Sequence, residues 1–209
     1  MNDEIKLYYD LTAETTADQW YKETILQPTI DEFMKLLPPY PAILDLGCGP
    51  GHESRRMAAN GARVLGVDFS PECIRVARER TPECRFEVMD LRRLEERIGK
   101  FDGVWACASL IHINPCELPG VVQNIQSVLK IGGYAALIVQ DGAGVKEEWS
   151  ELTVGPYKLR RTVYCYTQEH LVFVAEPANL KFVCRGYLDE SLEEQGWRNY
   201  IFRHIYEGE

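Results

Sequence analysis

The chain has 209 residues, of which 45% are hydrophobic, and its formal net charge is −9. This length suits a single α/β domain, and the apolar share is that of an ordinary globular protein. The acidic balance argues against a nucleic-acid partner, because an acidic surface repels phosphate backbones and the Arg-rich run at residues 85–100 is interleaved with acids.

The first 40 residues are expected to form a helical cap. Between Asp18 and Leu37, apolar side chains recur near helical spacing, and the cluster Pro38–Pro41 ends any helix that reaches it. Aromatic residues are dense here, and a lid over a ligand or simple packing on the core explains them equally well. The chain opens without a signal-peptide pattern and has no apolar run long enough to cross a bilayer, which favours a cytoplasmic location.

A glycine-rich turn is the most informative feature of the chain. A short apolar strand, residues 43–46, runs directly into Gly47–Gly51 and then into a helix that begins at His52. Glycine lacks a Cβ, so it turns the chain sharply and lets backbone N–H groups approach a ligand closely. A strand, a glycine turn and a helix N-terminus in this order predict a binding site for a nucleotide-like cofactor.

The next strand, residues 62–69, supports this prediction because it ends in an acid. Asp68 follows Gly47 by about 20 positions, the spacing at which a nucleotide-binding βαβ unit places a carboxylate on the ribose hydroxyls. Ser70 then stands at the N-cap of a second helix, which is expected to run to about Arg80.

A third strand, residues 85–89, ends at Asp90 and Leu91. The acid is placed to accept a hydrogen bond from an adenine amino group, with the leucine beside a ring face. The core then continues with a fourth strand at 101–107, a helix at 117–129 and a fifth strand at 134–140.

The last third of the chain is expected to complete the sheet. After a polar stretch to Pro156, residues 157–166 alternate in places and predict an extra strand or a substrate-covering arm. Thr167 is a suitable N-cap for a helix that reaches about Ala175. Residues 181–188 and 197–205 predict an antiparallel pair of edge strands, joined by an acidic turn at 189–196.

These ordered motifs resemble the class I S-adenosylmethionine-dependent methyltransferases, and most of all their small-molecule branch, which includes the ubiquinone-biosynthesis and tellurite-resistance types. The resemblance covers residues 41–141, and its motifs are Asp45–Gly51, Gly66–Ser70, Met89–Leu91, Phe101–Trp105 and Leu129–Gly133. It implies a three-layer Rossmann-like fold with a seven-stranded, mostly parallel sheet, an antiparallel C-terminal strand pair and an N-terminal helical cap. The expected single domain divides into a cap (1–40), a cofactor-binding core (41–141), a substrate-covering arm (142–166) and a C-terminal helix with edge strands (167–209).

The resemblance also implies the cofactor, S-adenosyl-L-methionine, which leaves as S-adenosyl-L-homocysteine. Asp45 and the backbone of the turn and of Ala106 are expected to hold its amino-acid end, Asp68 its ribose, and Asp90 with Leu91 its adenine. The full set of expected cofactor contacts is Asp45, Gly47, Cys48, Gly49, Gly51, Asp68, Phe69, Ser70, Asp90, Leu91 and Ala106, with Tyr8, Trp20 and Tyr21 from the cap.

The acceptor side offers fewer signals. His112 follows the fourth strand, at the sheet edge where ligands bind, and is the best candidate for a general base. The alternative, weighed slightly higher, is that its ring hydrogen-bonds the loop backbone and closes the cofactor pocket. Four residues are expected to line an acceptor cavity: Tyr157, Arg160, Arg161 and Tyr164. The two adjacent arginines suggest an anionic acceptor, although a surface charge pair is the commoner explanation.

The sequence therefore predicts an enzyme, monomeric or homodimeric, that transfers a methyl group to a small molecule by in-line displacement. Two alternatives remain: a non-catalytic module that binds the same cofactor, and an NAD-dependent oxidoreductase. NAD is disfavoured because His52 occupies the third glycine position of the dinucleotide fingerprint. Seven cysteines without a C-x-x-C pair fit a reducing compartment and give no zinc or other metal site, and Cys48 is interpreted as a small residue of the turn rather than a nucleophile.

Overall fold

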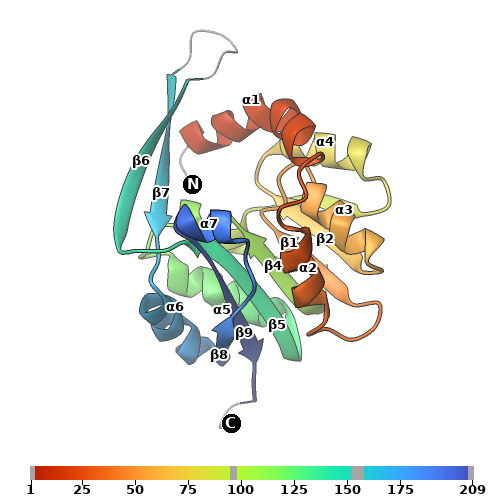
Figure 1. The fold of residues 1–209 in the computed structure, drawn as a ribbon, viewed down its shortest axis with the longest axis vertical. Coiled ribbons are helices and arrows are strands. Elements are labelled where there is room, and N and C mark those ends of the chain that lie inside the picture. The colour runs from red at the N-terminus through yellow and green to blue at the C-terminus, as the bar shows by residue number, and fades with distance from the viewer. Residues whose placement is uncertain (1–2, 95–97, 152–157, 207–209) are drawn as a thin grey trace.

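The central feature of the molecule is a seven-stranded sheet with helices on both faces (Figure 1). The structure, a computed structural model, describes residues 3–94, 98–151 and 158–206, with the backbone alone for 3, 147–151 and 158–160. The strand order is β3-β2-β1-β4-β5-β9-β8. The strands are β1 (Ala42–Leu46), β2 (Arg63–Asp68), β3 (Arg85–Val88), β4 (Phe101–Cys107), β5 (Leu129–Gln140), β8 (Leu180–Arg185) and β9 (Trp197–His204).

Strands β1 to β5 are parallel to their neighbours, and β9 runs antiparallel to both β5 and β8. The predicted mostly parallel sheet with an antiparallel C-terminal pair is thus confirmed. The helices that surround it are α1 (Asp3–Trp20), α2 (Gln27–Met34), α3 (His52–Ala59), α4 (Pro71–Arg80), α5 (Leu118–Val128), α6 (Gln168–Ala175) and α7 (Glu190–Glu194). Within the described residues, no helix is both long enough and apolar enough to cross a membrane.

Two apolar layers hold the sheet between its helices. On one face, Phe33 of α2 and Met57 of α3 pack with Trp105 of β4. On the other face, the helices α5 and α6 contribute Ile125 and Leu171. Because both faces are covered, the central strands consist almost wholly of buried apolar residues, as expected of a parallel sheet.

Helix α1 begins at Asp3, well before the segment in which the sequence predicted helix. Where the helix packs on α4, its buried face is made of small residues, Ala13 and Ala17, which contact Cys73. Asp10 adds a hydrogen bond from the Ser70 hydroxyl (2.6 Å). Such a face lacks the large apolar residues that produce a periodic signal, so the pattern in the sequence is weak.

A separate hairpin stands beside the sheet. Strands β6 (Gly144–Glu151) and β7 (Lys158–Cys165) pair antiparallel with each other, and β7 continues past α1 (Figure 1). The sequence predicted β7 as a strand or arm but gave β6 only as a polar stretch. A two-stranded ribbon outside the main sheet needs no strict alternation of apolar and polar residues, which is why β6 was missed.

The acidic turn at 189–196 also differs from its prediction. It contains the one-turn helix α7, whose N-cap Asp189 accepts a hydrogen bond from the Ser191 backbone N–H at 3.0 Å. This helix brings Leu192 and Gln195 over the carboxyl end of the sheet, where the candidate site lies.

Candidate functional site

A cavity of about 760 Å³ lies at the carboxyl ends of the parallel strands. Its walls come from the glycine turn, the tips of β2 and β4, helix α1, the β6–β7 hairpin and the segment from α7 to β9. Ligand sites of α/β sheets are found at this edge, and cofactor pockets commonly have volumes of about 300–1,000 Å³. The predicted site residues that line the cavity are Tyr8, Trp20, Gly47, Cys48, Gly49, Asp68, Phe69, Leu91, His112 and Arg161.

The glycine turn is held tightly against its neighbours. Gly47 has a φ of +79°, and a Cβ built there would lie 2.4 Å from the Cβ of Ser109. The backbone N–H groups of Gly47 and Cys48 both donate to the carbonyl of Val67, at 2.8 and 3.0 Å. The turn therefore needs glycine at position 47 for two reasons, the left-handed backbone and the close approach of the β4 loop.

Asp68 joins the turn to the tip of β2. Its carboxylate accepts hydrogen bonds from the backbone N–H groups of Gly49 (3.0 Å) and Ser70 (2.8 Å). Burial raises the pKa of Asp68 to about 6, and these hydrogen bonds oppose the rise. Each carboxylate oxygen keeps lone-pair capacity, so the group is able to accept from a diol in the cavity as well.

Asp45 lies behind the turn rather than in the cavity wall. It is 1% exposed, and the Ser54 hydroxyl donates to its carboxylate at 2.5 Å. The acid that does line the cavity is Glu53, which accepts a hydrogen bond from the indole N–H of Trp105 at 2.8 Å. Burial raises the pKa of both acids, and for Asp45 the nearby Glu53 adds to the rise. Sequence analysis missed Glu53, although an acid in the first turn after a glycine loop is a usable signal.

Asp90 is also turned away from the expected contact. Its carboxylate accepts from the backbone N–H of Arg92 (2.9 Å) and pairs with the guanidinium of the same residue (2.6 Å). This pairing lowers the pKa of Asp90, against the opposing effect of its partial burial. The apolar neighbours Met89 and Leu91 line the cavity instead, so the cavity wall on this side is hydrophobic rather than acidic.

Four further predicted cofactor contacts lie outside the cavity lining, namely Gly51, Ser70, Ala106 and Tyr21. Gly51 is the left-handed N-cap residue of α3, and Ser70 caps α4 by accepting from the Cys73 N–H at 3.1 Å. The Tyr21 hydroxyl donates to the Pro50 carbonyl (2.9 Å) and also bonds the Thr81 hydroxyl (2.6 Å). Tyr21 therefore braces the glycine turn from outside.

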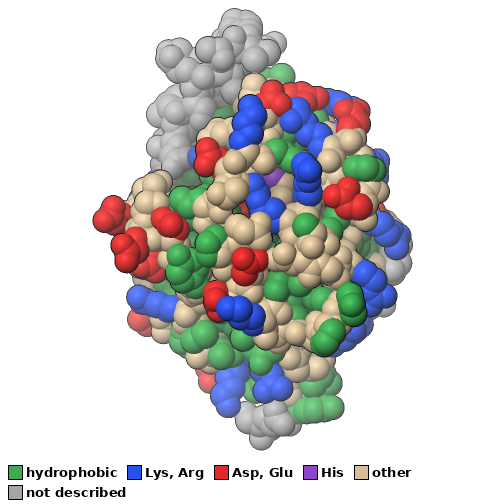
Figure 2. Space-filling model, turned by 45° about the vertical axis from the view of Figure 1, so that its right-hand side comes forward, with side chains coloured by type: hydrophobic (Ala, Val, Ile, Leu, Met, Phe, Trp, Pro, Cys, Tyr) green, Lys and Arg blue, Asp and Glu red, His purple; other side chains and the backbone are tan. Residues whose placement is uncertain are grey.

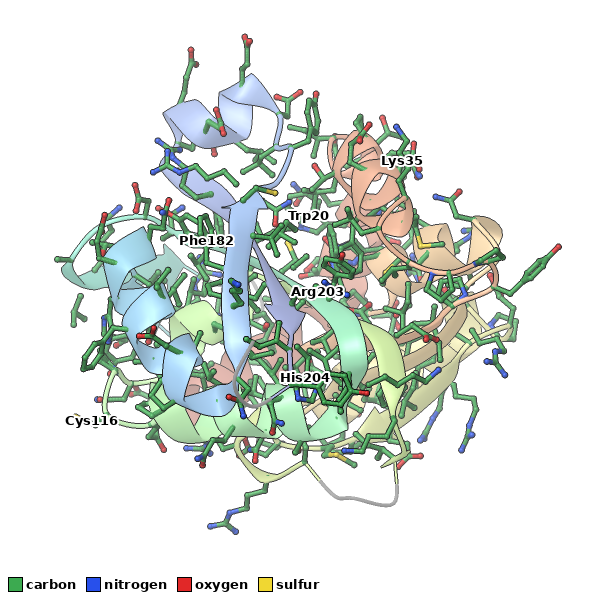
Figure 3. All side chains as sticks on the ribbon, turned by 90° about the horizontal axis from the view of Figure 1, so that it is seen from below. Trp20, Lys35, Cys116, Phe182, Arg203 and His204 are labelled. Atoms are coloured by element: carbon green, nitrogen blue, oxygen red, sulfur yellow. The ribbon has the colours of Figure 1, made fainter. Side chains whose placement is uncertain are left out.

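Trp20 covers the first turn of α3. Its ring stacks on that of His52, with the centroids 5.8 Å apart and an interplanar angle of 23°. Figure 3 shows Trp20 between the N-terminal helices and the segment that carries α7. Burial lowers the pKa of His52 to about 3, so this ring is neutral at physiological pH. The sequence considered His52 only as the residue replacing a glycine.

His112 lies at the junction of three elements. Its Nε2 is 2.7 Å from the Tyr9 hydroxyl of α1, and its Nδ1 is 3.3 Å from the Thr162 carbonyl of β7. A carbonyl only accepts, so Nδ1 carries the proton and Nε2 accepts from Tyr9. Burial raises the pKa of Tyr9, which keeps the phenol protonated. Tyr9, which also lines the cavity, was missed in favour of its neighbour Tyr8.

A second buried histidine shows what a purely structural role looks like. His204, labelled in Figure 3, has its Nδ1 3.2 Å from the Leu129 carbonyl and its Nε2 2.8 Å from the Gln126 side chain. It lies at the end of β9 and does not line the cavity. His112 differs because both it and its phenol partner Tyr9 line the cavity.

Of the four residues predicted for the acceptor cavity, Arg161 lines it. Its guanidinium carbon lies 5.4 Å from the ring centre of Tyr8. The side chain of Arg160 lies outside the described part. Tyr164 points away and accepts a hydrogen bond from the Asn114 side chain at 3.3 Å. Tyr157 also falls outside the described residues.

Cys48 lines the cavity but is not an activated nucleophile. Burial raises the pKa of its thiol well above the usual value, and the acids Asp45 and Asp68 add to the rise. A thiol in such surroundings stays protonated and unreactive. Among the described residues, no group of three or more His, Cys, Asp or Glu side chains forms a metal site.

Comparisons with known proteins agree with this geometry. Residues 43–133 match the family described as "Methyltransferase domain". Trans-aconitate 2-methyltransferase of Enterobacter sp. is 35% identical over 101 residues, which cover 47% of this chain and 39% of that protein. Demethylmenaquinone methyltransferase of Beutenbergia cavernae is 24% identical over 222 residues, which cover 98% of this chain and 84% of that protein.

Among solved structures, the Burkholderia thailandensis 1,6-didemethyltoxoflavin-N1-methyltransferase superposes with a TM-score of 0.73 at 19% identity. The alignment covers 98% of this chain and 88% of that one. Such a likeness shows the fold. In sequence, by contrast, the matched part of the chain spans less than half the length of curated relatives such as the trans-aconitate enzyme, of which it covers 39%.

Proposed function

Because this chain is a member of the class I S-adenosylmethionine-dependent methyltransferases in its fold and core motifs, we propose that it transfers a methyl group from S-adenosyl-L-methionine to a small molecule. The observation that carries the proposal is a single cavity bordered by the glycine turn, the Asp68 carboxylate and the apolar pair Met89 and Leu91. These three kinds of wall match the amino-acid end, the ribose and the adenine of the donor.

The residues present fit this cofactor. Position 47 has no room for any side chain, which leaves the backbone of the turn exposed to the cavity as a cradle. Asp68 is already oriented by two backbone N–H groups, so binding a diol requires no rearrangement of its carboxylate. Gly47, Cys48, Gly49, Asp68, Phe69 and Leu91 would hold the donor, with Trp20 and Tyr8 from the cap.

When bound, the donor supplies an electrophilic methyl group on its sulfonium, so the protein needs no covalent intermediate. The task of the chain is to hold the acceptor in line and to exclude water, and orientation of this kind lowers a barrier by about 7–11 kcal/mol. Helix α1 and the hairpin serve this purpose, because together with the α7–β9 segment they form the outer walls of the cavity.

We assign proton removal to His112 with the help of Tyr9. The Nδ1–H bond to Thr162 fixes the tautomer that leaves a basic lone pair on Nε2. The Tyr9 hydroxyl takes the proton from the substrate atom that is methylated, and it passes its own proton to Nε2 of His112 at the same time. The phenol therefore stays neutral, and the positive charge resides on the imidazole. A purely structural role for His112 predicts instead that its replacement changes stability and donor binding alike.

A nucleic-acid acceptor is a poor fit for this chain. The formal charge is −9, and the face drawn in Figure 2 shows acidic and basic side chains interspersed. Binding to a phosphate backbone depends on several basic side chains acting together. We therefore place the acceptor among small molecules.

Calorimetry with S-adenosylmethionine and S-adenosylhomocysteine tests the proposal. We expect both to bind, and D68N to weaken binding of both at least tenfold without loss of fold. Incubation with methyl-labelled donor and a small-metabolite extract should then yield a labelled product. Lack of affinity for both nucleosides would refute the assignment, and affinity without turnover would favour a non-catalytic module.

A further inference from the structure

The cavity has two chemically different halves. Among the described residues that line it, the acids are Glu53 and Asp68, which belong to the glycine-turn side. The cations are Lys146 and Arg161, and both come from the β6–β7 hairpin. The wall that remains once a donor is seated on the turn therefore carries positive charge.

The two acids are occupied by the fold itself. Asp68 accepts from two backbone N–H groups of the turn region, and Glu53 accepts from the Trp105 indole. Burial also raises the pKa of both acids. Neither acid is placed on the hairpin, where it would neutralise the cations directly.

The two cations are held so that they face the cavity. Arg161 lies over the ring of Tyr8 at 5.4 Å, and the Lys146 ammonium is 3.5 Å from the Gln140 side-chain oxygen at the end of β5. Backbone pairing sets Glu148 opposite Arg161, and the side chain of Glu148 lies outside the described part. A full negative charge on Glu148 would still leave Lys146, Arg161 and Glu148 together with one net positive charge.

This arrangement is unusual for so acidic a chain. A protein with a net charge of −9 repels anions at long range, so it attracts an anionic ligand only through a local concentration of cations. A guanidinium also presents a fork of N–H donors that matches a carboxylate in a bidentate way. The indole of Trp197 and the amide of Gln140 complete this wall.

We infer that the methyl acceptor bears an acidic oxyanion group, most simply a carboxylate, which Arg161 and Lys146 bind from the hairpin while Tyr9 and His112 meet the atom to be methylated. This inference rests on the proposed function, since it takes the glycine-turn side of the cavity as the donor site. It makes the hairpin the element that selects the acceptor.

The test measures the preference of the donor-loaded protein for charge. The full chain is saturated with S-adenosylhomocysteine and titrated by calorimetry with benzoate and tricarballylate, each against its amide. We expect each acid to bind at least tenfold more tightly than its amide. Phenyl phosphate is titrated as a third anionic ligand. If it binds and benzoate does not, the recognition of an anion is supported and the oxyanion group of the acceptor is a phosphate.

Two variants assign the preference to the hairpin. R161Q and K146Q should each reduce the acid-over-amide preference at least fivefold while leaving the affinity for S-adenosylhomocysteine within twofold. K181Q removes the same charge from the exposed side of β8 and is the matched control, with no expected effect. Retained nucleoside affinity shows that a variant is folded.

The outcomes separate the two proposals. A protein that fails to bind S-adenosylhomocysteine refutes the proposed function. If the protein binds S-adenosylhomocysteine but binds the acids no more tightly than their amides, or binds neither measurably, the inference about the acceptor is refuted. A preference that survives in both R161Q and K146Q refutes the role of the hairpin.

Discussion

Replacement of Gly47 by alanine tests the geometry of the glycine turn directly. The residue has a φ of +79°, and an added Cβ would lie 2.4 Å from the Cβ of Ser109. A left-handed backbone costs a non-glycine residue about 1–2 kcal/mol. Overpacking against the β4 loop adds about 1–3 kcal/mol, since the clash is with a Cβ rather than a flexible side-chain end.

A matched control separates these two terms. Gly49 also has a positive φ, +51°, but a Cβ added there meets nothing within 4 Å. We therefore expect G49A to lose about 1–2 kcal/mol of unfolding free energy from the backbone alone. G47A should lose about 2–5 kcal/mol, which at this chain length lowers the melting temperature by about 2–4 °C for each kcal/mol.

The assay is urea unfolding of both variants, together with calorimetric binding of S-adenosylhomocysteine. A second control is the double variant G47A/S109G, which removes the clashing Cβ and should recover the overpacking part of the loss. If G47A and G49A unfold within about 0.5 kcal/mol of each other, or if S109G gives no recovery, the close approach of the β4 loop is not what requires glycine at position 47.

Three further predictions concern the surroundings of the turn and the base. Burial raises the pKa of Asp68 to about 6, above its unfolded value. The contribution of Asp68 to the free energy of unfolding should therefore be largest at low pH and decline as the pH rises from about 4 to 6. Urea titrations at several pH values should show this decline in the unchanged protein and not in D68N. Y9F should leave S-adenosylhomocysteine affinity within twofold yet slow methyl transfer about 100-fold, and equal loss of both would refute its catalytic role. Y21F, which frees the Pro50 carbonyl, should weaken calorimetric nucleoside binding severalfold although Tyr21 does not line the cavity; unchanged affinity would contradict its bracing role.

The sequence predicted the core of the fold well because that information is local. A buried apolar strand, a glycine turn and a capped helix each leave a pattern within about ten residues. The strand β4 was predicted to the residue, and Ser70 was correctly predicted as the cap of α4. The elements without a local signal, the part of α1 before Asp18 and the strand β6, depend on packing against segments far away in the chain, which no local pattern reports.

The same distinction explains the site residues. Tyr8 and Tyr9 are adjacent in α1, so they point about 100° apart, and only the position of His112, 103 residues later, decides which of them meets its ring. Asp45 and Glu53 present a similar case. The strand places Asp45 beneath the turn, and the first turn of α3 brings Glu53 to the cavity wall. The burial of Asp45 cannot be read from residue type or spacing, whereas Glu53 had a signal in its position in the first turn after the glycine loop.

The two halves of the cavity therefore differ in whether their residues lie within the part of the chain that matches the family. The family match ends at residue 133, so it includes the glycine turn, Asp68 and His112. The other walls lie outside it: Tyr9 precedes the match, and Lys146, Arg161 and Trp197 follow it. On the proposed assignment, the donor side lies within the family match and the acceptor wall lies outside it, an arrangement that allows one fold to serve many acceptors. It follows that substitutions at Arg161 or Lys146 should change which acceptor is used, whereas substitutions at Gly47 or Asp68 should abolish methyl transfer for every acceptor.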